Sequence, residues 1–501
     1  MWKNLLLEPD KSRARTWPLP ALLVICGAAT LLFQGSRGLY ETTEGRYAEC
    51  AREMAQAGSW LEPVLNGQPH WTKPPLTYLS IRLPYEVLGA TTWAARLYLV
   101  PCHLLAIAAV GWLALRLWRD RDSARMGALV FATSAIPMLA SQTVSTDYPM
   151  AVSLALAQAL FWESVRSRSR LAAHGVWLFM GLAFLAKGPP SLLVLPAMVA
   201  AWFRLPREER KAVPLFSPSA LALFAFVGFG WYVWEAWKHP GLFDYWLRDE
   251  VVNRSLSDKF NRNPEFYKGF VIYLPVLLFG TLPWSGWLAL RWRETWARLR
   301  MTGGLRAVWS GRSAEEVWLF FAVALPLGVF MLSRSKLPLY LLPLFVPLAV
   351  AVGRLMLSVW GEDSRFRKRL SVTACAALSV FVVGKAVSTY VPSGSDMGAL
   401  RDRLVARCGP DLCPQLALLN GRPLNGLSYY LGYEPVFLSL ATLDGWLGEA
   451  GRSGRDSLVL ADQYHVERIR AQLGARACEE LKLSGKWRVL RIPAAKRDPA
   501  R

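Results

Sequence analysis

A polar segment of an otherwise apolar chain opens with Tyr40-Glu41-Thr42-Thr43-Glu44-Gly45-Arg46-Tyr47-Ala48-Glu49 and closes with Trp71-Thr72-Lys73-Pro74-Pro75-Leu76. The first stretch holds three glutamates and an arginine, and the second places a lysine before two prolines. A loop that only joins two membrane helices has no need for these groups, because charged side chains near hydrocarbon are costly. We therefore interpret residues 40–76 as the edge of a functional site at a membrane surface.

Long apolar runs surround this segment on both sides. The 501 residues are 53% hydrophobic with a mean hydropathy of +0.23, and many runs approach the ~20 residues that a helix needs to cross a bilayer. The first run lacks a convincing cleavage site, so we expect it to be retained. The pattern predicts a polytopic α-helical membrane protein with about eleven spans, near residues 17–34, 92–115, 126–143, 148–165, 171–186, 189–204, 214–236, 268–290, 315–333, 337–358 and 369–390.

The formal net charge of +21 gathers at every second junction between these runs. That alternation follows the positive-inside rule and predicts a cytoplasmic amino terminus. Anionic lipid headgroups attract such clusters, so the charge indicates membrane lipids as partners and no nucleic acid. The clusters are Lys3 to Arg15; Arg116, Arg119, Arg121 and Arg125; Arg166, Arg168 and Arg170; Arg204, Arg207, Arg210 and Lys211; Arg291 through Arg312; and Arg365, Arg367, Lys368 and Arg369.

This orientation places two folded parts outside the cytoplasm. We expect residues 1–391 to form a transmembrane domain whose exterior loop, 35–91, carries interfacial helices, one of them from Glu44 to Ala57. Residues 392–501 should form a small soluble α/β domain. Its predicted strands and helices are Gln415–Leu419, Ser457–Ala461 and Trp487–Ile492, and Met397–Arg407 and Val466–Leu473.

Two cysteines lie close together in this exterior tail. Cys408 and Cys413 could form a disulfide if the compartment is oxidising. A zinc site is a weaker interpretation, because the nearest other cysteine is Cys478 and no histidine follows closely.

The ionisable residues at the exterior junctions are the candidates for chemistry. Carboxylates beside fixed cations suit group transfer from a phosphate-bearing donor, because cations stabilise the leaving phosphate and a carboxylate can act on the acceptor. Nucleotide sugars are scarce outside the cytoplasm, so a lipid-linked phosphosugar is the plausible donor. The set comprises Glu41, Glu44, Lys73, Asp147, Lys187, Asp249, Glu250, Arg254, Arg334, Lys336 and Tyr340.

Simpler structural roles compete with these assignments. Glu44 could be a first-turn helix acid, Asp147 could be a helix N-cap, and Lys73 could reach toward headgroups. Glu41 could be a solvated loop acid, and the other cations could be headgroup contacts. His70 and His239 fit interfacial residues better than metal ligands.

The order of these motifs resembles that of the aminoarabinose transferase and protein mannosyltransferase superfamily, which has the GT-C fold. The resemblance covers most of residues 35–360. It rests on Glu44-Gly45-Arg46-Tyr47-Ala48-Glu49, Lys73-Pro74-Pro75, Asp147, Ala186-Lys187-Gly188 and Lys336-Leu337-Pro338-Leu339-Tyr340. It implies sugar transfer from a polyprenyl-phosphate carrier at the periplasmic face of the bacterial inner membrane, and in related enzymes the acceptor is lipid A.

The chain departs from the family pattern at three positions. Thr43 stands where the family has the first acid of an Asp-Glu pair. Thr72 and Val251 stand at the positions of an acid and a histidine that are implicated in a zinc site. We therefore expect no metal and no cofactor at those positions, and the identity of the sugar stays open.

These considerations predict a membrane glycosyltransferase. Lys73, Arg254 and Lys336 would bind the donor phosphate and Tyr340 would hydrogen-bond it, while the carboxylate would be supplied by Glu44, Asp147 or Glu41. The acceptor would be an envelope glycolipid such as lipid A, or a protein. The alternative is a transporter or flippase for an anionic lipid-linked sugar. Transporters place ionisable groups on broken helices near mid-membrane, whereas here these groups gather at one face, which favours the enzyme.

Overall fold

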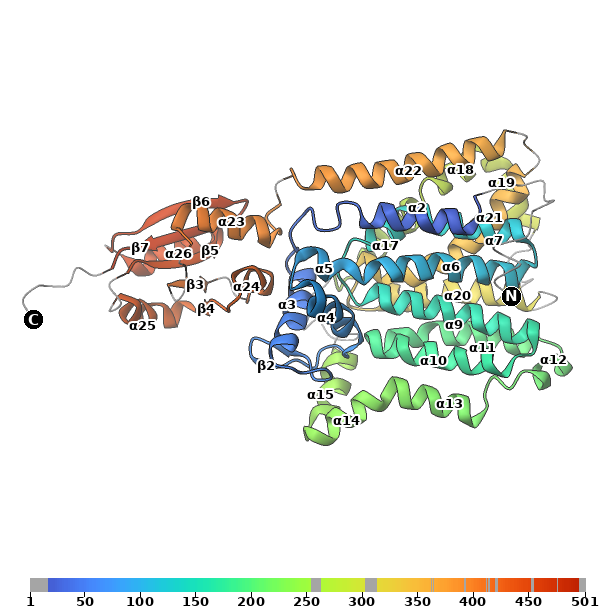
Figure 1. Ribbon diagram of the computed structural model, residues 1–501, viewed down its shortest axis with the longest axis horizontal. Coiled ribbons are helices and arrows are strands. Elements are labelled where there is room, and N and C mark those ends of the chain that lie inside the picture. Colours follow the sequence, from blue (N-terminus) through green and yellow to red (C-terminus); the bar gives the residue numbers. More distant parts are fainter. Residues whose placement is uncertain are drawn as a thin grey trace, which may run out of the picture.

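The computed structural model describes residues 17–253, 263–301, 313–361, 363, 365–391, 393–410, 412, 415–419, 422–451, 455–474 and 476–494. Arg254 and Cys413 therefore lie outside the described residues. The described chain forms a helical bundle and a smaller sheet-containing domain that projects from one end of it (Figure 1). This arrangement confirms the predicted fold class, a polytopic helical protein with a small α/β domain.

Each predicted apolar run is helical in the structure, although several are broken. The bundle contains α2 (Leu19–Leu31), α6 (Leu99–Trp118), α7 (Arg121–Thr133), α8 (Ala135–Ala140), α9 (Asp147–Ser167), α10 (Arg170–Lys187), η1 (Pro189–Val194), α11 (Leu195–Arg204), α12 (Arg207–Ala212), α13 (Pro218–Phe224), η2 (Ala225–Phe229), α14 (Gly230–Lys238), α17 (Phe266–Gly280), α18 (Trp284–Leu290), α19 (Trp292–Met301), α20 (Ala314–Leu332), η6 (Pro338–Leu344), α21 (Phe345–Trp360) and α22 (Phe366–Ser388).

Length and composition qualify a smaller number of these as membrane spans. Among the described residues five continuous helices are long and apolar enough, and a sixth is counted if α17 and α18, bent by 82°, form one span. The other runs are short, as α2 is, or carry charges at their ends, as α9 and α10 do. The chain is a multi-pass membrane protein, and the total of about eleven spans stays a prediction. The five continuous helices that qualify as spans are Thr92–Trp118, Pro218–Lys238, Ala314–Leu332, Pro338–Trp360 and Phe366–Ser388.

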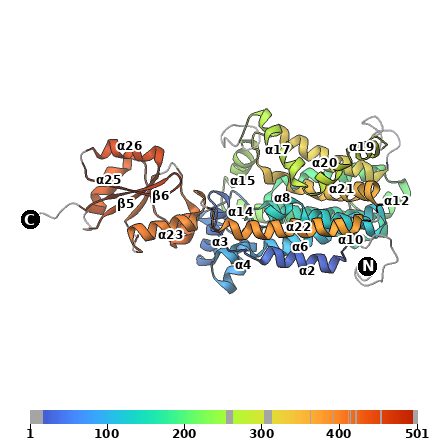
Figure 2. The same cartoon turned by 90° about the horizontal axis from the view of Figure 1, so that it is seen from above.

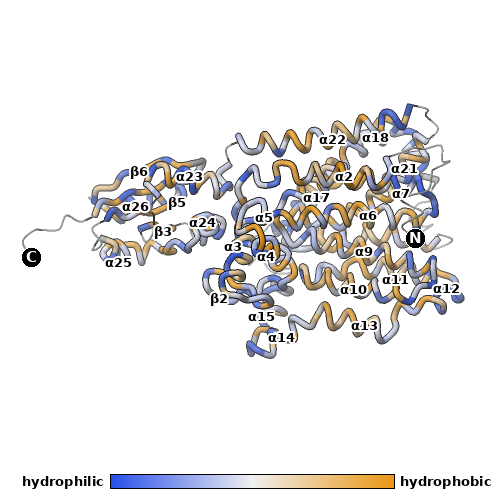
Figure 3. The backbone as a smooth tube through the Cα atoms, viewed as in Figure 1, coloured by the Kyte–Doolittle hydropathy of each residue, from blue (hydrophilic) through white to orange (hydrophobic). Residues whose placement is uncertain are grey.

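Apolar residues make up most of the bundle helices, and hydrophilic residues concentrate toward the helix ends (Figure 3). In the centre, α6 packs against α7 and α9, α9 against α10, and α7 against α21. The α7–α21 contact depends on glycine, since a Cβ on Gly353 would lie 2.8 Å from the backbone nitrogen of Gly127. Small residues at such a contact let two membrane helices approach closely.

One end of the bundle, here called the loop end, carries residues 35–91, which the charge pattern predicts to lie outside the cytoplasm and which are called the exterior loop below. Its elements are α3 (Thr43–Gln56), β1 (Val64–Leu65), β2 (Gln68–Pro69), α4 (Leu76–Leu88) and α5 (Thr92–Leu97), and beside them lie α14, α15 (Leu242–Tyr245) and η3 (Trp246–Asn253) (Figure 1). The 14 residues of α3 are too few to span a bilayer. It buries an apolar stripe that includes Tyr47, Cys50 and Met54, as the spacing predicts.

The smaller domain is built on a five-stranded sheet of order β4-β3-β5-β7-β6. The strands β4, β3 and β5 run parallel, whereas β7 pairs antiparallel with both β5 and β6. Two hydrophobic clusters, one with α23 and α24 and one with α25 and α26, cover the sheet. The elements are α23 (Met397–Cys408), β3 (Leu416–Leu419), α24 (Asn425–Leu431), β4 (Val436–Phe437), α25 (Leu440–Gly451), β5 (Ser457–Asp462), α26 (Gln463–Leu473), β6 (Glu479–Ser484) and β7 (Trp487–Ile492).

The sheet domain meets the bundle through α24, which packs against α3 (Figure 1). The view from above shows the same domain beyond the end of the bundle that carries α3 and α4 (Figure 2). A Cβ on Gly45 would lie 2.4 Å from the Cα of Gly426, so the two backbones touch only because both residues are glycine. Nearby, the Tyr430 hydroxyl accepts a hydrogen bond from the Leu39 backbone N–H at 2.8 Å. These contacts place the domain on the loop end.

Candidate functional site

Glu44 lies in the first turn of α3 and is enclosed by positive charge. Its carboxylate accepts hydrogen bonds from Arg37 at 2.5 and 3.2 Å and from Arg96 at 3.0 and 3.3 Å. The backbone N–H groups of Tyr40 and Val144 each donate to it at 3.0 Å. The side chain is 2% exposed. Glu44 thus joins the start of the exterior loop, helix α5 and the segment that leads into α9.

The charge state of Glu44 follows from these contacts. Burial alone would raise its pKa, but the guanidinium groups of Arg96 and Arg37 outweigh burial and lower the pKa to about 2. A carboxylate with such a low pKa is a poor proton acceptor at neutral pH. Its geometry fits a group that fixes the loop in place, whereas the sequence suggested a catalytic carboxylate.

Glu41 faces the sheet domain. Its Oε2 accepts a hydrogen bond from the backbone N–H of Gly426 at 2.8 Å. Burial raises the pKa of Glu41, and this hydrogen bond and the charges of Arg422 and Arg46 offset part of the rise. The contact lies between the two domains, so Glu41 fits an interdomain contact.

Asp147 forms a compact group with Lys187 and Tyr340. Lys187 donates a short hydrogen bond to Asp147 Oδ1, and the Lys187 ammonium lies 4.4 Å from the centre of the Tyr340 ring. Asp147 is 6% exposed. The structure therefore brings together one predicted carboxylate and one predicted tyrosine through a lysine that the sequence placed at the same face.

The backbone around these three residues explains how they meet. Asp147 is the first residue of α9 and Lys187 is the last of α10, so both lie at the loop end. Gly188 then adopts a φ of +81°, which favours glycine, and the following proline-rich turn η1 starts a new direction. Tyr340 lies in η6, another short turn that begins with proline.

Lys73 pairs with Glu250 across the loop end. The Lys73 ammonium lies 2.8 Å from Glu250 Oε2 and also donates to the carbonyl of Thr72 at 2.7 Å. The segment before Lys73 is held by Trp246, whose indole N–H donates to the Trp71 carbonyl at 2.8 Å. The side chains of Lys73 and Glu250 are largely buried, so this pair is a preformed feature and not a flexible surface contact.

The two lysine–carboxylate pairs are neighbours through Tyr232. The Tyr232 ring packs on the Trp246 ring with 4.8 Å between centroids. Its hydroxyl lies 3.1 Å from the position that a Cβ on Gly188 would take. Tyr232 therefore connects the residue after Lys187 to the helix that carries Glu250. Both pairs thus lie at the loop end with Tyr232 between their segments, and their two cations and two carboxylates could bind and activate an anionic substrate.

Lys336 is placed differently from the prediction of an open phosphate ligand. It is 1% exposed, and its ammonium donates to the carbonyl of Ser333 at 2.6 Å and to those of Asn263 and Pro264 at 3.4 Å. Burial and the nearby charge of Arg334 lower its pKa. In this conformation the ammonium faces the backbone just before α17 and just after α20.

Several residues of this region were not assigned from the sequence. Arg96 could have been recognised from the sequence, because a charged residue within an apolar run indicates a buried partner. Lys187 and Glu250 were recognised as polar residues at the correct face, but no local pattern links Lys187 to Asp147 or Glu250 to Lys73. Those pairings arise only when distant helices pack.

His70 should make the stability of the folded protein depend on pH. Its Nε2 lies 2.7 Å from the Thr72 hydroxyl. Burial, together with the charges of Arg46 and Lys73, lowers its pKa from 6.5 to about 3. Between these two pH values the unfolded chain binds the proton more readily, so stability falls as pH drops through this window. We expect the loss of Tm between pH 7 and pH 5 to be smaller in His70→Gln than in the wild type.

The control for this prediction is His174→Gln. His174 lies on α10 and bonds to the Arg170 carbonyl and to Ser219, away from the loop end. Its replacement removes a histidine outside the loop end, and an equal effect of both variants would contradict the prediction.

Comparison with known sequences finds that the chain is similar to membrane sugar transferases. Residues 37–246 match the family of dolichyl-phosphate-mannose-protein mannosyltransferases. The undecaprenyl phosphate-alpha-4-amino-4-deoxy-L-arabinose arabinosyl transferase of Erwinia tasmaniensis is 31% identical over 364 residues, 69% of this chain and 62% of the relative. The enzyme of that name from Pseudomonas aeruginosa is 30% identical over 349 residues, covering 68% of this chain and 60% of the relative. The chain thus spans about three fifths of these curated relatives.

Solved structures show the same fold over nearly the whole chain. The crystal structure of ArnT from Cupriavidus metallidurans bound to undecaprenyl phosphate aligns with a TM-score of 0.74 and 18% identity, covering 94% of this chain and 97% of the other. An oligosaccharyltransferase from Archaeoglobus fulgidus aligns with a TM-score of 0.54 and 11% identity, covering 97% of this chain and 75% of the other. Fold, sequence match and motif order agree, and the chain belongs to the GT-C superfamily of aminoarabinose transferases and protein mannosyltransferases.

Proposed function

We propose that this protein is a glycosyltransferase that moves a sugar from a polyprenyl-phosphate carrier to an envelope lipid at the periplasmic face of a bacterial inner membrane. The observation that carries the proposal is the pair of neighbouring lysine–carboxylate contacts, Asp147–Lys187 and Lys73–Glu250, at one end of a membrane bundle. The sequence relatives, named as undecaprenyl-phosphate arabinosyl transferases, support it. Their names favour a pentose, 4-amino-4-deoxy-L-arabinose, as the sugar.

The proposed reaction breaks the bond between the anomeric carbon and the phosphate oxygen. The acceptor oxygen supplies the electron pair for the new glycosidic bond, and the polyprenyl phosphate leaves with the electron pair of the broken bond. Lys73 stabilises the charge that grows on the leaving phosphate, and Asp147 orients the acceptor or takes its proton.

The remaining predicted residues take supporting roles in this proposal. Tyr340 and Lys187 hold Asp147 in place and offer further contacts to the donor. Lys336 and Arg254 stay candidate phosphate ligands, and Lys336 must turn away from its backbone carbonyls to serve. Glu44 and Glu41 fix the loop and the sheet domain around the site.

The experiment that tests the function is reconstitution. The purified protein would be mixed with undecaprenyl-phosphate 4-amino-4-deoxy-L-arabinose and lipid A, and both lipids would be followed by mass spectrometry. We expect modified lipid A and free undecaprenyl phosphate in equal amounts. Movement of unmodified donor across a vesicle bilayer, with no modified acceptor, would instead support a transporter.

Lys73→Ala should reduce transfer in this assay by about 100-fold or more, the loss typical for removing one group that stabilises transition-state charge. Lys268→Ala is the matched control, because Lys268 lies in the first turn of α17 with its ammonium over the Tyr267 ring and has no role in the proposed site. Equal expression and equal monodispersity of the two variants would show that the loss is chemical. A Lys73→Ala variant with normal transfer would remove Lys73 from the site.

A further inference from the structure

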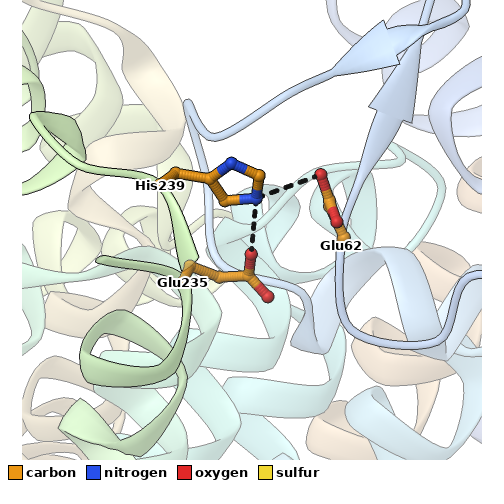
Figure 4. Close-up of side chains that lie close together, drawn as sticks. All are labelled: Glu62, Glu235 and His239. Atoms are coloured by element: carbon orange, nitrogen blue, oxygen red, sulfur yellow. Dashed lines mark ion pairs between the residues drawn. The ribbon is translucent and has the colours of Figure 1, made fainter. Parts of the chain in front are cut away.

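Three potential metal ligands meet where the exterior loop touches α14. Glu62 comes from the loop, just before β1, while Glu235 and His239 lie one helical turn apart at the end of α14 (Figure 4). His239 Nε2 is 3.5 Å from Glu62 Oε1 and 3.7 Å from Glu235 Oε2. All three ligand atoms lie within 4.8 Å of one another.

The loop and the helix hold these side chains in position. The Ser59 hydroxyl donates to the Glu62 carbonyl at 2.7 Å and accepts from the Glu62 N–H at 3.2 Å. The indole N–H of Trp231, one turn before Glu235 on α14, donates to the Leu61 carbonyl at 2.8 Å. The cluster is therefore built on two fixed segments and not on freely moving side chains.

The buried carboxylate of Glu235 is the strongest indication of a ligand at this cluster. The Glu235 side chain is 0% exposed, yet among the described residues neither carboxylate oxygen has a hydrogen-bond partner, and His239 Nε2 has none either. The Trp71 indole lies beside the Glu235 carboxylate but does not meet hydrogen-bond geometry. A buried carboxylate without hydrogen bonds is strongly unfavourable unless it is paired or coordinates a metal.

The distances fit a metal better than a direct contact. Two ligand atoms that each lie about 2.0–2.1 Å from a tetrahedral Zn²⁺ are about 3.3–3.4 Å apart. The observed 3.5 and 3.7 Å are close to that spacing, whereas they are long for a hydrogen bond. One imidazole and two carboxylates form an N/O ligand set that suits zinc.

We propose that Glu62, Glu235 and His239 bind one divalent metal ion, with Zn²⁺ as the best fit. The side chains of Glu62 and His239 are 25% and 34% exposed, so the ion can enter from the surface and keep water as a fourth ligand. This assignment replaces the expectation that His239 is only an interfacial residue. It uses none of the positions Thr72 and Val251, where the family pattern would put metal ligands.

The proposed ion would connect the exterior loop to α14 near the Lys73–Glu250 pair. The His239 ring packs on the Trp71 ring with 4.7 Å between centroids, and Trp71 precedes Lys73 by two residues. A metal at this place would therefore fix the segment that carries Lys73. The inference goes beyond the proposed transfer reaction, and its test does not depend on transfer.

The test measures zinc on the full-length protein in detergent. The protein would be stripped with a chelator, separated from it, loaded with ZnCl₂ and desalted, and bound zinc would be measured by mass spectrometry of the metal. We expect one equivalent of zinc and a higher Tm in its presence, because an ion that binds only the folded state stabilises it. Glu62→Gln and His239→Gln should each lower zinc affinity by at least about 10-fold.

The matched control is His174→Gln, which removes a histidine elsewhere and should keep the wild-type zinc content. Glu62→Gln preserves side-chain shape at a partly exposed loop position, so it also serves as the variant that should fold normally. Wild-type protein that retains no zinc and shows no change of Tm would overturn the proposal. Variants that keep the wild-type affinity would overturn it equally.

Discussion

Asp147→Asn is expected to lower the rate of sugar transfer by about 10²–10⁴-fold, the range for loss of a positioned acid–base group. The substitution keeps the shape of the side chain but removes the charge that faces Lys187. It also removes the only one of the three candidate carboxylates that is not tied to two arginines or to the sheet domain. Initial rates with a polyprenyl-phosphate sugar and lipid A, normalised to folded protein, measure the effect.

The matched control for this variant is Asp244→Asn. Asp244 is an exposed aspartate on α15 that pairs with exposed Arg248, and exposed pairs contribute little to stability. Its replacement should leave transfer unchanged. If Asp147→Asn retained more than a tenth of wild-type transfer while folding normally, the catalytic carboxylate would have to be sought elsewhere.

Glu44→Ala should be the most destabilising single change at the loop end. It leaves Arg37 and Arg96 with buried positive charge and no counter-ion, and breaking a buried pair in this way costs about 3–5 kcal/mol. We expect a lower Tm and a lower yield of monodisperse protein. The comparison variant is Asp244→Ala, which breaks a pair between two exposed side chains at the same end of the bundle and should cost about 1 kcal/mol or less.

Lowering the pH should weaken the contacts of Glu44 with Arg37 and Arg96 in the wild type and so lower its Tm. The pKa of Glu44 falls from 4.5 to about 2 on folding, so its stabilising contribution is complete above pH 4.5 and is lost as pH falls through 2. Glu44→Gln lacks this titration. Its Tm should therefore change less than that of the wild type between pH 5 and pH 3, and a parallel change in both proteins would contradict the assignment.

The difference between Glu44 and Asp147 shows where sequence reasoning reached its limit. Both were candidate carboxylates at the same face, and the alternating charge clusters were enough to place them together. The sequence could not separate their roles, because Glu44 is neutralised by arginines from two other segments, whereas Asp147 meets a lysine 40 residues away. The decisive contacts are between residues that no local pattern links.

The sequence by itself determined the membrane class, the helical runs and most elements of the sheet domain. These features follow from hydropathy and from periods of two or 3.6 residues, which are local properties of the chain. The tertiary structure alone decided the partners: Lys73 with Glu250, Lys187 with Asp147, and Glu62 with Glu235 and His239. The physical reason is that ion pairs and ligand sets form between helix ends whose spacing is fixed by packing, and packing joins residues far apart in the sequence.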